Sequence, residues 1–162
     1  VAKANVMIAD INQQRLDFVS QSMGIPSTIL LKGDNSDFEA VRERGNARLA
    51  DVIIDATGNN HSMVRAFEFA AFAGRVVYVG IAHQSLTFQH APTFHRRELT
   101  LLASRNALPK DFERIVRLIE SGQINTDPWM THHAPFDEVP NVFDHWIEPG
   151  SGVIKAIVEV ST

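Results

Sequence analysis

Short apolar runs recur along the chain. Most of them are followed by a segment in which apolar residues have the spacing of a helix. The runs lie at residues 5–9, 28–31, 51–55, 76–79 and 99–103. After the first run, Leu16, Val19 and Met23 have helical spacing and Gly24 ends the helix. Strands that alternate with helices predict an α/β fold, with a parallel sheet covered by helices on both faces.

The next helices are predicted from capping signals and glycines. Ser36 and Glu39 have the spacing of a capping box, so we expect a helix from there to about Gly45. Apolar residues at 63, 67, 70 and 71 predict another helix, which ends at Gly74 as its C′ glycine. Residues 82–97 have no clear period and contain Pro92, so we expect a loop there.

The C-terminal third differs from the rest of the chain in its composition and in its predicted elements. Pro109 begins a predicted helix whose apolar face contains Phe112, Ile115, Val116 and Ile119, and Gly122 ends it. Residues 137–146 predict one more helix, and residues 153–160 predict a closing strand. Prolines are frequent from about residue 123 onward, and we expect this tail to pack outside the sheet.

Composition limits the possible functions. The chain has 162 residues, a net charge of −4 and no cysteine. The length predicts one domain, and the missing thiols exclude a disulfide scaffold, a thiol nucleophile and a thiolate zinc site. The only adjacent basic pair is Arg96-Arg97, so we expect no nucleic-acid partner. Three charges between residues 63 and 82 argue against a membrane span, and the cysteine-free chain fits the cytoplasm.

Candidate ligand-binding residues directly follow the apolar runs. They are Asp10, Thr57-Gly58, Gly80-Ile81 and Ser104-Arg105-Asn106. Ligands of open parallel sheets bind beyond the carboxyl ends of the strands, where these residues would meet. A carboxylate such as Asp10 can accept both hydroxyls of an adenosine ribose. Asp10 could equally cap the helix that follows it.

Other site motifs are absent or incomplete. No Gly-x-Gly-x-x-Gly motif occurs, and Gly150-Ser151-Gly152 precedes a strand, so we interpret it as a turn. A Gly-x-Ser-x-Gly nucleophile motif is also absent. The histidines at 90 and 95 and the adjacent pair at 132 and 133 lack a His-Glu-x-x-His context. We expect surface or hydrogen-bonded histidines and no metal ligands, although His83 follows a strand end and could line a pocket.

The order and spacing of these segments resemble the cofactor-binding half of the medium-chain, zinc-type alcohol and polyol dehydrogenases. The resemblance covers nearly the whole chain. Residues 6–16 resemble the second strand of the family and its helix. The later matches are 51–58 to the fourth strand, 74–80 to the fifth, 99–105 to the sixth, 131–143 to a late segment and 152–155 to the closing strand.

The resemblance implies a role in cofactor binding for ten residues. Asp10 would hold the adenosine ribose and favour NAD over NADP, with Arg15 beside it. Thr57 and Gly58 would border the cofactor, and Lys155 would match a basic residue near the pyrophosphate. Backbone groups near the nicotinamide carboxamide would come from Val79, Gly80, Ile81, Ser104 and Arg105. No residue of this chain would be catalytic or bind metal.

The resemblance also implies an incomplete doubly wound, Rossmann-like sheet. The family order is 3-2-1-4-5-6, and the first strand, its glycine loop and the zinc-bearing catalytic domain precede the part matched here. We therefore expect residues 1–162 to be a single dinucleotide-binding fragment with a gap in the sheet, inactive alone. Residues 123–162 would pack toward the catalytic domain. The complete protein would be an NAD-dependent homodimer or homotetramer that oxidises a secondary alcohol, polyol or sugar acid.

Two other functions fit parts of the pattern. Methyltransferase-like domains also place an acidic residue after the second strand, but we find no closing antiparallel hairpin in the tail. A non-catalytic dimerisation or regulatory nucleotide-binding domain is the other alternative, with residues 82–97 and 99–103 at its interface. Nucleotide binding separates these alternatives.

Overall fold

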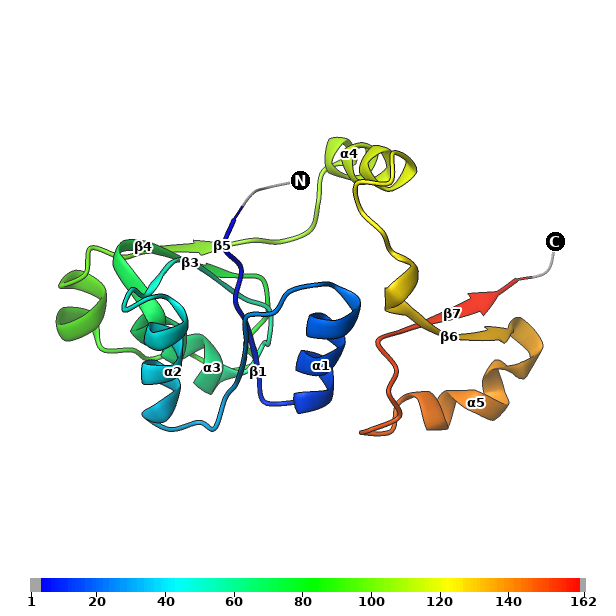
Figure 1. The fold of residues 1–162 in the computed structure, drawn as a ribbon, viewed down its shortest axis with the longest axis horizontal. Coiled ribbons are helices and arrows are strands. Elements are labelled where there is room, and N and C mark those ends of the chain that lie inside the picture. The colour runs from blue at the N-terminus through cyan, green and yellow to red at the C-terminus, as the bar shows by residue number, and fades with distance from the viewer. Residues whose placement is uncertain (1–3, 161–162) are drawn as a thin grey trace.

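The computed structural model describes residues 4–160, and its strands form three small parallel sheets (Figure 1). The first sheet pairs β1 (Ile8–Asp10) with β2 (Thr28–Leu30). The second has the order β3 (Ala50–Asp55), β4 (Ala70–Tyr78), β5 (Thr100–Ala103). The third pairs β6 (Met130–Pro135) with β7 (Lys155–Glu159).

The helices connect these strands in the alternating order that the sequence predicts. They are α1 (Gln13–Ser22), α2 (Ser36–Arg44), α3 (Asn60–Arg65), α4 (Pro109–Glu120) and α5 (Val139–Trp146). Short helical turns are η1 (Ala66–Phe69), η2 (His90–His95), η3 (Asp127–Trp129) and η4 (Phe136–Glu138). The α/β class with parallel strands is confirmed.

A gap separates the first two sheets. Within residues 4–160, β1 pairs only with β2, and β3 pairs only with β4. The expected sheet order without its first strand places these two unpaired edges next to the gap. On β3, Val52 and Ile54 are 49% and 67% exposed, which is unusual for apolar residues of a parallel strand. The sheet is therefore interrupted where the sequence predicts a missing strand.

The core lies beside the middle sheet and is aromatic. Its buried members are Ala66, Phe67, Ala70, Val76 and Leu99. The ring of Phe67 lies 4.5 Å from the ring of Phe88 and 5.5 Å from that of Phe94. Apolar packing thus fixes the segment between β4 and β5 against η1.

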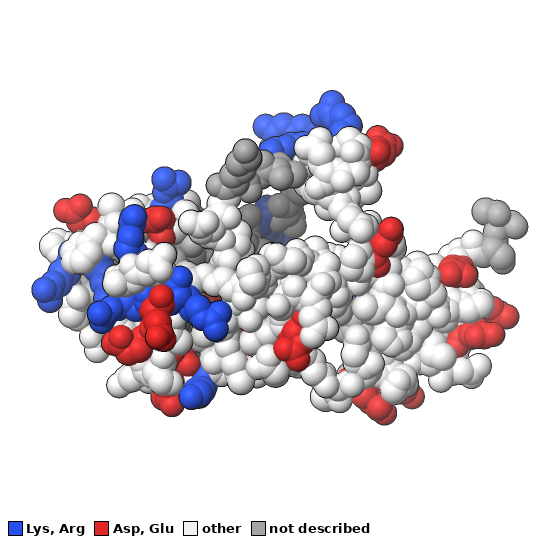
Figure 2. All heavy atoms as spheres, in the orientation of Figure 1, with Lys and Arg blue, Asp and Glu red and all other residues white. Residues whose placement is uncertain are grey.

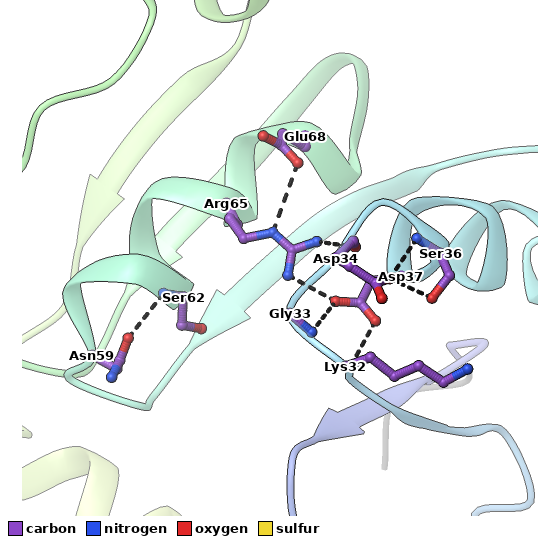
Figure 3. Close-up of polar contacts among 9 residues, drawn as sticks. All are labelled: Lys32, Gly33, Asp34, Ser36, Asp37, Asn59, Ser62, Arg65 and Glu68. Atoms are coloured by element: carbon purple, nitrogen blue, oxygen red, sulfur yellow. Dashed lines mark hydrogen bonds and ion pairs between the residues drawn. The ribbon is translucent and has the colours of Figure 1, made fainter.

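A buried ion pair connects the first half of the fold to the second (Figure 3). Arg65, at the end of α3, donates a 2.7 Å hydrogen bond to the carboxylate of Asp37, in the first turn of α2. The side chains are 13% and 1% exposed. Asp37 also accepts backbone N–H groups of Lys32 (2.8 Å) and Gly33 (2.9 Å), and Arg65 donates to the Asp34 carbonyl. The carboxylate therefore ties the β2–α2 turn to α3.

The predicted helix ending at Gly74 is wrong in its second half. α3 ends at Arg65, one 3-10 turn follows, and Gly74 lies inside β4. The left-handed residue is Ala73, with a φ of 57°, in a bulge where the pairing register shifts. The guanidinium of Arg97 donates to the carbonyl oxygens of Glu68 (2.8 Å) and Ala70 (2.9 Å), so a distant side chain satisfies the end of this helical segment.

The predicted capping box at Ser36 is also wrong. Asn35 occupies the N-cap position, and Ser36 is the first helical residue. The carboxylate of Asp34 accepts the backbone N–H and the hydroxyl of Ser36, and these hydrogen bonds lower its pKa. Two aspartates therefore organise the start of α2 in place of the serine and glutamate that the spacing suggested.

The region after residue 80 departs from prediction in two places. The expected loop at 82–97 contains the π-helical turn η2. The strand β6 has no counterpart among the apolar runs, since Thr131, His132 and His133 interrupt it. β6, α5 and β7 form a unit outside the β3–β4–β5 sheet (Figure 1), as the frequent prolines from about residue 123 onward indicated. The remaining strands and helices shift by one to three residues from their predicted bounds.

Helix α4 is amphipathic, but no neighbouring element covers its apolar face. Its apolar residues Phe112, Ile115, Val116 and Ile119 are all exposed. Basic residues Lys110, Arg114 and Arg117 lie on the same helix, where Figure 2 shows Lys and Arg gathered at its outer side. A helix with this pattern normally buries its apolar stripe, so α4 presents a surface suited to further packing.

The Asp37 ion pair predicts an acid-sensitive contribution to stability. Burial raises the pKa of Asp37, but hydrogen bonds from Lys32, Arg65 and Gly33 outweigh it and hold the pKa below its ordinary value. This stabilisation is complete above the unfolded-state pKa of about 3.9. It is lost as the pH falls through the lower pKa of the folded state.

Asp37→Asn should therefore lower the free energy of unfolding at pH 7 by about 3–5 kcal/mol, because it leaves Arg65 without its charged partner. Urea unfolding from pH 7 to pH 2 should show a weaker acid dependence than in the parent chain. Glu39→Gln removes one partner of the exposed Arg42–Glu39 pair and should cost less than about 1 kcal/mol. Equal costs for the two substitutions would contradict this account.

Candidate functional site

The candidate site is the edge where β1, β3, β4 and β5 end. The strands within each sheet are parallel, so their carboxyl ends lie on one side. Asp10 ends β1, and Thr57-Gly58 follows β3. Gly80-Ile81 follows β4, and Ser104-Arg105 follows β5. Eight of the ten residues proposed from sequence lie at or just beyond these strand ends, and Arg15 lies in the first turn of α1 with its guanidinium beside Asp10.

Asp10 does not cap helix α1. The N-cap is Asn12, whose side chain accepts the backbone N–H groups of Gln14 (2.9 Å) and Arg15 (3.3 Å). One carboxylate oxygen of Asp10 accepts the Asn12 N–H at 2.8 Å, and the other lies 3.7 Å from the Arg15 guanidinium. The Asp10 side chain is 27% exposed. Its outer oxygen can therefore accept hydrogen bonds from a ligand.

A buried carboxylate shapes the turn after β3. Asp55 accepts the backbone N–H of Thr57 at 2.9 Å, the Thr57 hydroxyl at 2.7 Å and the Ser62 hydroxyl at 2.7 Å. These bonds tie the Thr57-Gly58 turn to helix α3. Sequence analysis missed this role of Asp55, although a carboxylate at a strand end two residues before a threonine is the signal of an Asx turn.

The same carboxylate acts on the neighbouring tyrosine. Tyr78, at the end of β4, donates its hydroxyl hydrogen to the carbonyl oxygen of Met63. Burial and the negative charge of Asp55 together raise the pKa of Tyr78 to about 12. Tyr78 therefore stays neutral in the physiological range and serves as a fixed donor that joins β4 to α3.

Two glycines allow the turns after β3 and β4 to touch. Gly58 has a φ of 65°, which favours glycine. A Cβ added to Gly80 would lie 2.3 Å from the Gly58 nitrogen, and one added to Gly58 would lie 3.0 Å from the Ile81 carbonyl oxygen. The N–H groups of Val79 (2.8 Å) and Gly80 (3.0 Å) both donate to the Asp55 carbonyl oxygen. The crossing is therefore a bare backbone surface.

The rim of this surface is apolar on one side and polar on the other. Val79 and Ile81 are exposed. The N–H of Ser104 donates to the Tyr78 carbonyl oxygen at 2.8 Å, which extends the β4–β5 pairing by one residue, and Arg105 is exposed just beyond it. A flat, partly apolar ligand with polar edges fits such a rim.

Lys155 is not brought to this edge. It is the first residue of β7, in the β6–β7 sheet, and lies well away from the middle sheet in Figure 1. Its carbonyl oxygen accepts the Thr131 hydroxyl, so its position is fixed within the C-terminal unit. The structure therefore does not group Lys155 with the other nine residues.

The polar groups at the edge suit a nucleotide. A partly exposed carboxylate at one strand end and a close glycine crossing at another match the ribose and the flat ring system of a dinucleotide. Among residues 4–160, no three His, Asp or Glu side chains are grouped as metal ligands. The described part of the chain also contains no helix long and apolar enough to cross a membrane.

The chain is similar to known dehydrogenases in sequence. A family model described as zinc-binding dehydrogenase matches residues 1–121. L-galactonate-5-dehydrogenase of Escherichia coli K12 is 34% identical over 156 residues, which are 96% of this chain and 45% of the relative. L-arabinitol 4-dehydrogenase of Hypocrea jecorina is 26% identical and matches 95% of this chain and 41% of its own length.

Solved structures support the same fold. A protein of Escherichia coli CFT073, described as a short chain alcohol dehydrogenase and solved with NADH, has a TM-score of 0.80 at 22% identity. The match covers 94% of this chain and 43% of that one. L-idonate 5-dehydrogenase of Escherichia coli K-12 has a TM-score of 0.73 at 20% identity, over 93% and 41%. The chain thus spans less than half the length of these relatives.

The charge of Asp55 should be measurable through Tyr78, which is the only tyrosine of the chain. Asp55→Asn keeps the shape of the side chain but removes its negative charge, so the pKa of Tyr78 should fall from about 12. It should stay above the ordinary value of 10.0, because burial remains. Phenolate absorbance followed against pH reports this change. Asp51→Asn, at an exposed position of the same strand, should leave it unchanged.

Proposed function

The chain belongs to the zinc-binding dehydrogenase family, and we propose that it forms the NAD(H)-binding part of an alcohol, polyol or sugar-acid dehydrogenase. The observation that carries the proposal is the partly exposed carboxylate of Asp10 at the end of β1, whose outer oxygen accepts, among residues 4–160, no hydrogen bond shorter than the 3.7 Å ion pair with Arg15. The family assignment favours this function over a methyltransferase-like domain. We also propose that residues 1–162 act as one dinucleotide-binding unit.

In this proposal Asp10 selects the cofactor. Its outer oxygen accepts the ribose hydroxyls of the adenosine half, while the N–H of Asn12 and the nearby Arg15 hold the carboxylate in place. A 2′-phosphate at the same position would meet a negative charge, so NAD binds better than NADP. The guanidinium of Arg15 lies beside that ribose without replacing the carboxylate.

The glycine crossing orients the other half of the cofactor. Gly58 and Gly80 expose backbone where a side chain would otherwise stand, with Thr57 at the border. Backbone groups of residues 79–81 and of Ser104 and Arg105 lie on the same rim and would bind the carboxamide. NAD supplies the hydride acceptor when bound, and this chain holds its ring against the substrate side. Lys155 would approach the pyrophosphate only if the C-terminal unit moves toward the site.

The substrate and the zinc belong to the remainder of the protein in this proposal. Zinc polarises the alcohol oxygen in such enzymes, and its ligands lie outside residues 4–160. Relatives named for L-galactonate and L-arabinitol support a polyol or sugar acid as the substrate. Residues 123–162 would pack toward that remainder, and the fragment alone would be inactive.

Assembly and location complete the proposal. The exposed apolar residues Leu101 and Leu102 on β5, together with the uncovered face of α4, support a homodimer or homotetramer. A complete enzyme of this kind would work in the cytoplasm, in keeping with the cysteine-free chain. No nucleic-acid partner is part of the proposal.

Cofactor preference tests the role of Asp10. Calorimetric titration of this chain should give a lower Kd for NADH than for NADPH. Asp10→Ser should raise the Kd for NADH by about tenfold or more, because a hydrogen bond to a charged group contributes about 1.5–3 kcal/mol. Asp17→Ser, on the exposed part of α1, should leave it unchanged. Equal affinity of the parent chain for both cofactors would overturn the assignment.

Metal removal tests the proposed chemistry on the longer protein. With NAD present, a protein that joins this chain to the proposed zinc-bearing part should oxidise polyols or sugar acids. Chelation of its zinc should abolish turnover, while NADH still binds. Zinc should restore the rate. Turnover that survives complete chelation would contradict a zinc-dependent mechanism, even if NADH binding to this chain behaves as proposed.

A further inference from the structure

A shallow hollow of about 270 Å³ lies away from the proposed nucleotide edge. It is lined by His90, Phe94, His95, Glu98 and Leu99. These residues belong to η2 and to the connection into the start of β5, so they lie near the amino ends of the strands. The proposed nucleotide site uses the carboxyl ends, and the hollow is therefore a separate feature.

The rings of the two histidines of this hollow lie close together. Their ring centres are 5.6 Å apart and their planes are inclined at 48°. A metal at about 2.0–2.1 Å from an imidazole nitrogen lies about 3.2 Å from the ring centre. When each ring turns one nitrogen toward a shared metal, a centre separation of 5.6 Å gives an angle of about 120° at the metal, close to the tetrahedral value.

The backbone that carries both histidines is held in place. Phe94, between them, packs against Phe67 in the aromatic core, and Leu99 is buried just after the turn. Glu98 has a φ of 54°, an uncommon conformation for a residue with a side chain. The π-helical turn and this strained residue fix the backbone spacing of the two histidines, whose exposed side chains remain accessible to a ligand.

From these observations we propose that His90 and His95 bind a divalent transition metal ion of the Zn²⁺, Ni²⁺ or Cu²⁺ class. Neutral imidazole is a preferred ligand of these ions. Water completes the coordination, since no third protein ligand is grouped with the pair within residues 4–160. This site lies in the chain itself and is independent of the zinc that the dehydrogenase function requires.

The surrounding charges permit such binding. Arg97 donates to the carbonyl oxygens of Glu68 and Ala70, so its guanidinium is engaged with η1. Arg96 is exposed and adds one positive charge beside the turn. The carboxylate of Glu98 lines the same hollow and offsets that charge. The net local charge therefore does not oppose a cation strongly.

The two histidines that are adjacent in the sequence, on β6, differ from the pair at the hollow. His132 and His133 are consecutive residues of β6 and point to opposite faces of the sheet. His132 contacts the Thr131 hydroxyl, and His133 contacts the Glu159 carboxylate at 3.1 Å. Histidines that are adjacent on a strand thus share no ligand site, whereas the five-residue spacing of His90 and His95 on a π-helical turn brings their rings close together.

Calorimetric titration of this chain with Zn²⁺ and with Ni²⁺ tests the proposal. We expect one site, and His90→Gln and His95→Gln should each raise its Kd by about tenfold or more, because a single imidazole remains. His61→Gln replaces an exposed histidine on α3 and should leave the Kd unchanged. Saturating Zn²⁺ should raise the Tm of the parent chain, and this rise should disappear in His95→Gln.

Histidine ring resonances provide a readout that does not depend on the variants. Paramagnetic Ni²⁺ or Co²⁺ should first broaden the signals of His90 and His95, before those of the other five histidines. Failure to bind either metal, or a Kd unchanged in both variants, would overturn the proposal. Both outcomes are independent of NADH affinity, so they are distinguishable from failure of the proposed function.

Discussion

The Asp37–Arg65 ion pair is the polar contact that joins the two halves of this fold. The β1–β2 and β3–β4–β5 sheets share no strand pairing within residues 4–160, so backbone hydrogen bonds do not hold one sheet beside the other. Asp37 is almost fully buried and accepts three hydrogen bonds, one of them from Arg65. A buried pair of this kind adds little net stability over apolar residues, but removing one partner is costly. Its main effect is therefore to specify one relative placement of α2 and α3.

That placement determines what the candidate site can do. Asp10 lies at the end of one sheet, and the Gly58–Gly80 crossing lies at the end of the other. A ligand that touches both must span the gap, so its affinity depends on how firmly the two sheets are held together. Asp55 has the corresponding role within the second sheet, because it fixes the Thr57-Gly58 turn and raises the pKa of Tyr78. Two buried carboxylates, neither of them a proposed ligand contact, thus position the groups that are.

Local patterns predicted the strands well and the connections poorly. Apolar runs such as 51–55 mark strands directly, because strands of parallel sheets are rich in apolar residues, even though Val52 and Ile54 of this strand are exposed beside the gap. The helix that was expected to reach Gly74 ends early because Arg97, more than twenty residues away, satisfies its last carbonyl groups. The strand β6 was missed because two histidines and a threonine mask its apolar character. Asp10, Thr57 and Gly80 could be found from their places after strands, whereas the remote position of Lys155 depends on tertiary packing.

Uncovered apolar residues accompany the gap between the two sheets. Val52 and Ile54 border the gap between the sheets, and α4 presents four apolar residues to solvent. A parallel strand placed between β1 and β3 would pair with both open edges. The same strand would bring its following loop to the carboxyl edge, between Asp10 and the glycine crossing, where a pyrophosphate would lie. The feature that completes the sheet is therefore also the one that completes the cofactor site, and stability and nucleotide affinity should rise together.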